Sequence, residues 1–169
     1  FLNASYETGF MNPIDEAIRK HRQIDLSGYK KLDEVPYDFI RKRLSLLIAK
    51  GDTHLMVTKG ALSNVLTVCS SAEIAEGRIV DIATVKEQVQ QHSEEFSRKG
   101  FRTLGVAYKD VGSNTVISRE QEADMMFLGF LILFDPPKPG ITETIRELKH
   151  LGVSLKIITG DNRLLAANV

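Results

Sequence analysis

"RLSLLIAKGDTHLMVTKGAL", from Arg43 to Leu62, is the stretch of sequence that decides the fold. Apolar side chains alternate with their neighbours on both sides of Lys50-Gly51-Asp52, at Leu44, Leu46 and Ile48 and then at Leu55 and Val57. Alternation of this kind predicts two half-buried strands, and a glycine-containing turn between them predicts an antiparallel hairpin. We therefore expect an antiparallel sheet at the centre of the domain.

The sequence on both sides of this hairpin predicts helices that flank the sheet. Asn12-Pro13 is typical of a helix start, and a helix is expected over 13–22. A short helix is expected over 61–69 and a longer one over 84–99, which Gly100 ends. "RTLGVAY" (102–108) and "MMFLGFLILF" (125–134) read as strands, the second of them buried on both faces or nearly so. These elements define an α+β domain.

The composition changes at "DPPKPG", residues 135–140, where three prolines and a glycine make a stiff connector. Beyond it, Ile141, Ile145 and Leu148 mark a helix, and "VSLKIIT" (153–159) reads as a strand. A helix followed by an apolar strand is one α–β step of a doubly wound parallel sheet. We therefore divide the chain into residues 1–134, an antiparallel domain, and residues 135–169, a segment of a second fold.

Bulk composition excludes several classes of protein. Lys plus Arg equals Asp plus Glu, at 22 each, so net charge gives no reason to expect a nucleic acid or an anionic membrane as partner. The single cysteine, Cys69, rules out an internal disulfide framework. The longest apolar run, 125–134, is too short to span a bilayer as a helix, which takes about 20 residues. Asn3-Ala4-Ser5 matches a glycosylation sequon, which we interpret as chance.

For several residues, the sequence allows both a ligand-binding role and a purely structural one. Lys59-Gly60 ends a strand, where the lysine can line a pocket and the glycine can admit a ligand, or both can simply form a solvated turn. Phe39 beside Arg41 can stack on a base while the guanidinium meets phosphate, or the charges can protect an edge strand. Arg102 can face the same ligand or be an ordinary surface arginine.

Carboxylates supply the remaining candidates. Asp15 can accept a hydrogen bond from a base amine, or can serve the helix dipole from its first-turn position. Asp135 opens the proline-rich connector, and Thr159-Gly160-Asp161 follows an apolar strand. A hydroxyl, an open backbone and a carboxylate at a strand end suit phosphate and a hard cation. The common phosphate-binding motifs G-x-x-x-x-G-K-[ST] and G-x-G-x-x-G are absent from the sequence.

Taken in order, these pieces resemble the cytoplasmic part of a P-type cation-transporting ATPase. The matching stretches are "NPIDEAI" (its P-T-E-G-A-L), "YDFIRKRLSLL" (its F-x-R), "MVTKGAL" (its K-G-A), "GFRTLGVAYKD" (its arginine strand), "LILFDPPKPG" (its D-P-P-R) and "IITGDN" (its T-G-D-N). The resemblance covers almost the whole chain. It implies a nucleotide-binding (N) domain at 1–134 and, at 135–169, the hinge and the first returning part of a phosphorylation (P) domain of the haloacid-dehalogenase type.

The resemblance also implies roles for single residues. Phe39 is expected to stack on adenine, Lys59 and Gly60 to line its pocket, and Asp15 to stand where the family has a glutamate that binds the base. Arg41 and Arg102 are expected to face the phosphates. Asp135, Thr159, Gly160 and Asp161 belong to the parent phosphorylation site, which is incomplete here because the D-K-T-G-T and G-D-G-x-N-D motifs are absent.

The function that follows from the resemblance is ATP binding, with Mg²⁺ accompanying ATP in the full-length enzyme. The chain is expected to bind ATP and ADP as a monomer without turning ATP over, and its partners are the rest of its own P domain, an actuator domain and a transmembrane domain. It would lie on the cytoplasmic side of the membrane without touching it. Leu62, in place of a proline after K-G-A, and "SYETGFMNPIDEAI" look closest to the magnesium-transporting branch. A free-standing phosphohydrolase and a regulatory domain without nucleotide binding remain alternatives.

Overall fold

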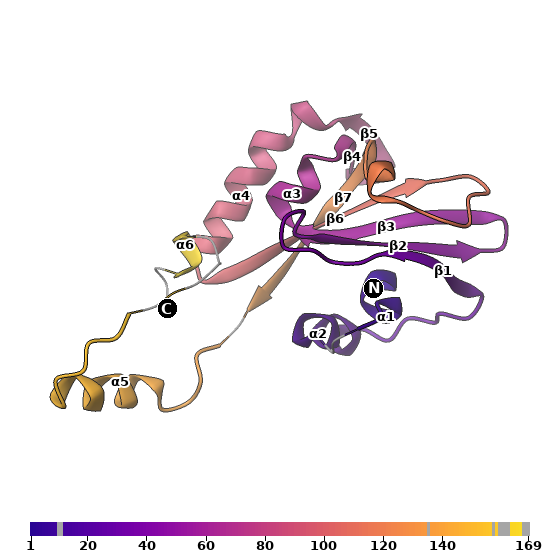
Figure 1. The fold of residues 1–169 in the computed structure, drawn as a ribbon. Helices are drawn as coiled ribbons and strands as arrows, with labels where there is room; N and C mark the ends of the chain where they lie inside the picture. The colour runs from indigo at the N-terminus through magenta and orange to yellow at the C-terminus, as the bar shows by residue number, and fades with distance from the viewer. Residues whose placement is uncertain (10–11, 135, 157, 159–162, 167–169) are drawn as a thin grey trace.

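The computed structural model describes residues 1–9, 12–134, 136–156, 158 and 163–166. Its described residues form a seven-stranded sheet in the order β1-β2-β3-β6-β7-β4-β5. The strands are β1 (Tyr29–Val35), β2 (Arg43–Lys50), β3 (Thr53–Ala61), β4 (Cys69–Ile74), β5 (Arg78–Asp81), β6 (Phe101–Asp110) and β7 (Met125–Phe134). Neighbouring strands are antiparallel except for β4 and β7, which are parallel. The predicted antiparallel sheet flanked by helices is therefore confirmed (Figure 1).

The predicted hairpin is the β2–β3 pair. Lys50 pairs with Thr53, so the connection is the two-residue turn Gly51-Asp52, in which Gly51 has a φ of 56°. A positive φ at this position is what the tight turn between two twisted strands requires, and glycine adopts it without a steric penalty. The register then sends alternate side chains of both strands to opposite faces of the sheet.

Each face of the sheet packs against its own pair of helices (Figure 1). On one face, α1 (Leu2–Tyr6) contacts β2, β3 and α2 (Pro13–His21), and Leu2 and Tyr6 pack on the buried strand residues Leu44, Leu46 and Ile48. On the other face, α3 (Leu62–Leu66) and α4 (Lys86–Arg98) lie against β6. The larger core is there, and it includes Leu47, Met56, Val65, Leu66, Met125 and Phe127.

Two of the predicted helices are confirmed with small changes at their ends, since α2 and α4 occupy most of 13–22 and 84–99. Asn12 does cap α2, because its side-chain oxygen accepts a hydrogen bond from the backbone nitrogen of Ile14 at 3.0 Å. The prediction of a helix over 61–69 is wrong at its end. α3 stops at Leu66, and Cys69 already begins β4. β4 and β5 were not predicted, because "CSSAEI" shows no apolar alternation and is a strand through its pairing with β7.

The prediction that 125–134 is buried on both faces or nearly so is also wrong. Met125 and Phe127 are buried, whereas Leu128, Ile132 and Phe134 are exposed. β7 runs beyond the area that the helices cover, and its last residues point toward the segment 136–156, here called the C-terminal arm (Figure 1). An apolar run shows that a segment prefers burial. Whether both of its faces are covered depends on helices and strands elsewhere in the chain.

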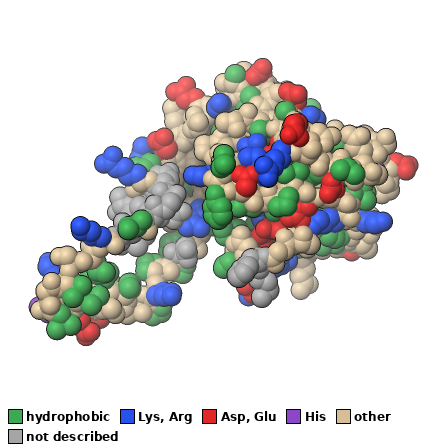
Figure 2. Space-filling view, viewed as in Figure 1, with side chains coloured by type: hydrophobic (Ala, Val, Ile, Leu, Met, Phe, Trp, Pro, Cys, Tyr) green, Lys and Arg blue, Asp and Glu red, His purple; other side chains and the backbone are tan. Residues whose placement is uncertain are grey.

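Beyond β7 the chain leaves the sheet, and α5 (Ile141–His150) lies apart from it (Figure 1). The expected helix is thus present. The expected strand at 153–159 is not seen in its described residues, 153–156 and 158, which pair with no strand. Figure 2 shows hydrophobic side chains gathered on this arm, where Ile141, Ile145 and Leu151 are exposed. Among the described helices, none has the length and apolar character needed to cross a membrane.

The buried Cys69 gives a first testable prediction. Burial raises the pKa of its thiol to about 11. The thiolate is the reactive form, and at pH 8 only about one thiol in a thousand carries it. We expect the folded protein to react with Ellman's reagent at least about 100-fold more slowly than the same protein in 8 M urea, because both access and ionisation are restricted. Equal rates in the two conditions would show that Cys69 is not in the core.

Candidate functional site

A pocket of about 230 Å³ opens on the sheet face that carries α1 and α2. Most of its wall is apolar and includes Val57 on β3, Val106 on β6 and Leu131 on β7. Asn3 from α1 and Lys59 from β3 supply polar groups. An apolar hollow with a few convergent polar groups is typical of a small-molecule site.

Lys59 reaches this pocket because of the strand register. It lies directly opposite Val106 in the β3–β6 pair, and both residues line the pocket. The lysine is only 7% exposed. Its ammonium donates to Asp15 and, at 3.1 Å, to Glu7 Oε2. A buried ammonium needs such partners, because removing an unpaired charge from water costs several kcal/mol, by an order-of-magnitude estimate.

The two carboxylates come from segments that the sheet brings together. Asp15 is in the first turn of α2, is 2% exposed and lies 44 residues from Lys59 in the sequence. Burial, followed by the neighbouring Asp15 carboxyl group, raises the pKa of Glu7 above its ordinary value. Asp15 Oδ2 and Asn3 Oδ1 are buried, and neither has a hydrogen-bond partner among the described residues. Asn3 lines the pocket, whereas Asp15 is not among the described lining residues and adjoins the pocket through its contact with Lys59.

Arg102 lies on the same face of the sheet as Lys59. It precedes Val106, the neighbour of Lys59, by four residues on β6, and side chains four apart on a strand point the same way. Gly60 is placed differently. A Cβ at Gly60 would lie 2.5 Å from Arg43 Cβ and 2.6 Å from Arg43 Cα, and would press on the Lys42 carbonyl. Its missing side chain leaves room for the backbone that enters β2.

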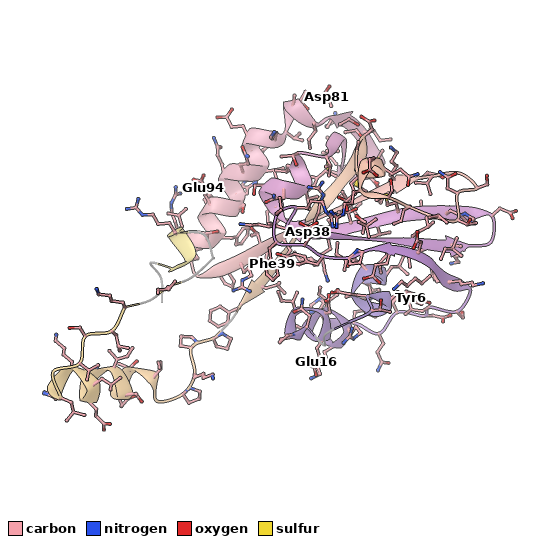
Figure 3. All side chains as sticks on the ribbon, in the orientation of Figure 1. Tyr6, Glu16, Asp38, Phe39, Asp81 and Glu94 are labelled. Carbon is pink, nitrogen blue, oxygen red and sulfur yellow. The ribbon has the colours of Figure 1, made fainter. Side chains whose placement is uncertain are left out.

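Phe39 lies on the loop between β1 and β2, at the end of the sheet where β2 begins (Figure 3). The same end holds Lys59, because the Ala61 nitrogen donates to the Lys42 carbonyl at 2.9 Å. Phe39 is 87% exposed, and its ring meets Tyr37 edge-on at a centroid distance of 5.6 Å. It is not among the described residues that line the pocket. The structure thus leaves the Phe39 ring exposed at the same end of the sheet as Lys59.

Arg41, two residues after Phe39, is held by protein acceptors on all three of its nitrogens. Nε donates to Asp38, Nη2 donates to the Pro36 carbonyl at 2.6 Å, and Nη1 donates to both oxygens of Glu122 at 2.6 and 2.7 Å. The hydrogen bonds to Glu122 and Asp38 outweigh burial and raise the pKa of the guanidinium. The structure therefore joins Arg41 to Glu122 and not to Lys59, Asp15 or Arg102.

Glu122 is the centre of a second polar cluster, on the face opposite the pocket. Its side chain has no exposed surface. Besides Arg41, it accepts from Arg43 Nε at 2.8 Å and from Ser45 Oγ at 2.7 Å. Ser45 Oγ in turn meets Thr58 Oγ1 at 2.6 Å. One carboxylate thus ties the start of β2 to the segment that precedes β7.

Sequence reasoning did not single out Asn3, Glu7 or Glu122. Asn3 was noticed only as part of a sequon, while Glu7 and Glu122 stand in short polar stretches without a helical or strand period. Their partners lie between 41 and 81 residues away. Asp135, Thr159, Gly160 and Asp161 lie outside the described residues. Within the part of the chain that the structure describes, no group of three or more His, Cys, Asp or Glu side chains is placed to hold a metal ion.

The comparisons with known proteins all lead to cation-transporting ATPases. A sequence profile described as "P-type ATPase, cytoplasmic domain N" matches residues 3–140. The chain is 33% identical over 177 aligned residues to "Magnesium-transporting ATPase, P-type 1" of Escherichia coli (strain K12), and 34% identical to the protein of that name in Salmonella typhimurium (strain 14028s / SGSC 2262). These alignments take in 100% of this chain and 20% of each relative. "Calcium-transporting ATPase PAT1" of Dictyostelium discoideum is 30% identical over 144 residues, 83% of this chain and 13% of that protein.

Proposed function

Since this chain belongs to the P-type ATPase family, in which it corresponds to cytoplasmic domain N, we propose that its pocket binds ATP. The observation that carries the proposal is the apolar pocket with a buried ammonium, Lys59, together with a buried oxygen on Asn3 and one on Asp15 that have no hydrogen-bond partner in the described part of the chain. Adenine is flat and apolar on its faces and carries an amino group that donates hydrogen bonds. A pocket of this composition suits it.

The proposed roles follow the positions of the side chains. The base enters the pocket, Phe39 stacks on it from the β1–β2 loop, and Asp15 and Asn3 accept hydrogen bonds from its amino group. Lys59 holds Asp15 in place and closes the polar side of the pocket. Arg102, on the same face of the sheet, attracts the phosphates. Mg²⁺ accompanies the phosphates, for which it is a natural counterion, and we assign it no ligand in the described residues.

We further propose that residues 1–134 form the ATP-binding unit and that residues 135–169 begin the return to the phosphorylation domain of a longer protein. The chain spans about a fifth of the length of the relatives that it matches. In that longer protein, the unit would hold the base and leave the γ-phosphate projecting toward a catalytic aspartate for in-line attack. The names of the bacterial relatives favour Mg²⁺ as the transported ion.

The binding energy expected of such a site is modest. One stacked base and a few polar contacts give about 4–6 kcal/mol, or dissociation constants from tens of micromolar to millimolar. A weak site suits a module that releases ADP in every cycle. The proposed partners are therefore ATP and ADP together with the remaining P, actuator and transmembrane domains of the same protein, and the isolated chain would bind nucleotide as a monomer without hydrolysing it.

Phe39→Ala tests this proposal without disturbing the core, because the side chain is 87% exposed. Stacking on an aromatic side chain stabilises a bound base by about 1–3 kcal/mol, so the affinity for ATP should fall about tenfold or more. The measurement is competition by ATP against the fluorescent analogue trinitrophenyl-ATP.

Ile40→Ala is the matched control. Ile40 is the next residue on the same loop and is 89% exposed. We expect it to bind ATP like the wild type, with both variants unfolding at the wild-type urea concentration. Unchanged affinity in Phe39→Ala would overturn the proposed base site.

A further inference from the structure

Apolar contacts within the loop that carries Phe39 do little to fix its conformation. Residues 36–42 form no helix or strand, and the neighbouring aromatic, Tyr37, is itself exposed. Lys42, at the end of the loop, has a φ of 51°, in the left-handed region that costs a side-chain-bearing residue about 1 kcal/mol. Other interactions must therefore maintain this conformation.

Polar contacts supply them, in two steps. Asp38 Oδ1 accepts from the backbone nitrogens of Ile40 at 2.9 Å and Arg41 at 2.7 Å, which folds the loop around Phe39. The Arg41 guanidinium then binds Asp38 and the Pro36 carbonyl, so that one side chain holds both the start and the middle of the loop. These bonds fix the shape of the loop but not its position on the sheet.

Glu122 fixes the position of this loop relative to the sheet. Both of its oxygens accept from one nitrogen of Arg41, Nη1, and the same carboxylate is held by Arg43 and Ser45 of β2. Hydrogen bonds between a charged donor and a charged acceptor are about twice as strong as bonds between neutral groups. The carboxylate is fully buried, and it stands on the sheet face opposite Lys59. It therefore cannot reach a ligand in the pocket, yet it determines where the loop lies.

From this arrangement we infer that Glu122 is a positioning residue of the nucleotide site, which acts through Arg41 to hold Phe39 where an adenine ring can stack on it. The inference rests on the proposed function, and it assigns Arg41 to the support of the loop. A ring that is already in place loses less conformational freedom when the base arrives. Without the Glu122–Arg41 bond, Phe39 would sample many positions, and nucleotide binding would have to order the loop each time.

A double-mutant cycle on the whole chain tests the inference. Glu122→Gln keeps the size of the side chain but removes its charge, and it should weaken ATP binding about tenfold, which is the cost of ordering a few side chains. In the Phe39→Ala background the same substitution should have no further effect, because the group through which it acts is gone. In the Lys59→Ala background it should retain its full effect. Additive losses with Phe39→Ala would overturn the inference.

A second readout does not depend on nucleotide at all. The chain has no tryptophan, so Phe39→Trp introduces a single fluorescent reporter into the loop. Time-resolved anisotropy should show restricted motion of this indole in the otherwise unchanged chain and a clear gain in sub-nanosecond motion when Glu122→Gln is added. Equal mobility in both proteins would contradict the inference.

The two readouts separate this inference from the proposed function. If the chain fails to bind ATP but the indole is released by Glu122→Gln, the positioning role stands and the ligand is another. If Glu122→Gln does not fold, as judged by circular dichroism, Arg41→Lys replaces it in both experiments. Lysine keeps the charge, but its single nitrogen cannot bind Asp38, the Pro36 carbonyl and Glu122 at the same time. Retention of full affinity and of a fixed indole in folded Arg41→Lys would likewise overturn the inference.

Discussion

Glu122→Ala is expected to lower the free energy of unfolding by about 3–5 kcal/mol, because it leaves two arginines without their shared buried carboxylate. The side chains of Arg41 and Arg43 are 13% and 11% exposed, so water can replace the lost partner only in part. Ser45 Oγ loses an acceptor in the same step. Because domains of this kind are stable by about 5–15 kcal/mol in total, the loss would be a large share of the whole.

Urea unfolding followed by circular dichroism at pH 7 measures this loss. Glu95→Ala is the matched control, since Glu95 is exposed on α4 and the same atoms are removed. Its effect should stay within about 0.5 kcal/mol. Similar midpoints for the two variants would mean that Glu122 is not the buried centre of the cluster.

Gly60→Ala is expected to be about as damaging, with a loss of about 3 kcal/mol or more, although it adds only one methyl group. The new Cβ would lie 2.5 Å from Arg43 Cβ and 2.6 Å from Arg43 Cα, on a backbone that cannot turn aside as a flexible side chain can. Relief would require β2 and β3 to separate at the Arg43–Gly60 pair. The hydrogen bond from the Ala61 nitrogen to Lys42 would be lost with it.

The control for this substitution is Gly112→Ala, in an open turn. Gly112 has a φ of 62°, and nothing lies within 4 Å of the position of its Cβ. It should cost about 1–2 kcal/mol, which is the penalty of the left-handed conformation alone. A Gly60→Ala protein as stable as Gly112→Ala would show that the two strands can absorb the methyl group.

Local patterns in the sequence predicted the centre of the fold well. The β2–β3 hairpin could be read because its apolar alternation and its glycine turn are both contained within twenty residues of sequence, from Arg43 to Leu62. α2 and α4 could be read for the same reason, from a cap and from a helical period. β4 could not be predicted in this way, because it becomes a strand by pairing with β7. In that pair Cys69 lies opposite Met125, which is far from it in the sequence. The exposure of the last residues of β7 could not be predicted either, because the local sequence does not show which helices cover a strand.

The candidate site divides in a similar way. Lys59, Asp15 and Arg102 were singled out through motifs. The β3–β6 register places Lys59 and Arg102 on one face of the sheet, and Asp15 reaches Lys59 from α2. Gly60 leaves room for the backbone at Arg43, where β2 begins, and no sequence motif connects these two residues. Glu7, Asn3 and Glu122 depend on side-chain contacts across the fold. Their ordinary local sequence gave no signal, since a carboxylate in a polar stretch is most often a solvated one.

The strand order also bears on how the chain assembles during synthesis. β4 enters the sheet through β7, and β5 enters only through β4. While the ribosome has not yet passed Met125, the β4–β5 pair therefore has no docking edge, whereas β2 and β3 can already form their hairpin. Among the described strands, β7 is made last and joins the two halves of the sheet, so newly made chains expose the edges of β4 and β6 until β7 has left the ribosome.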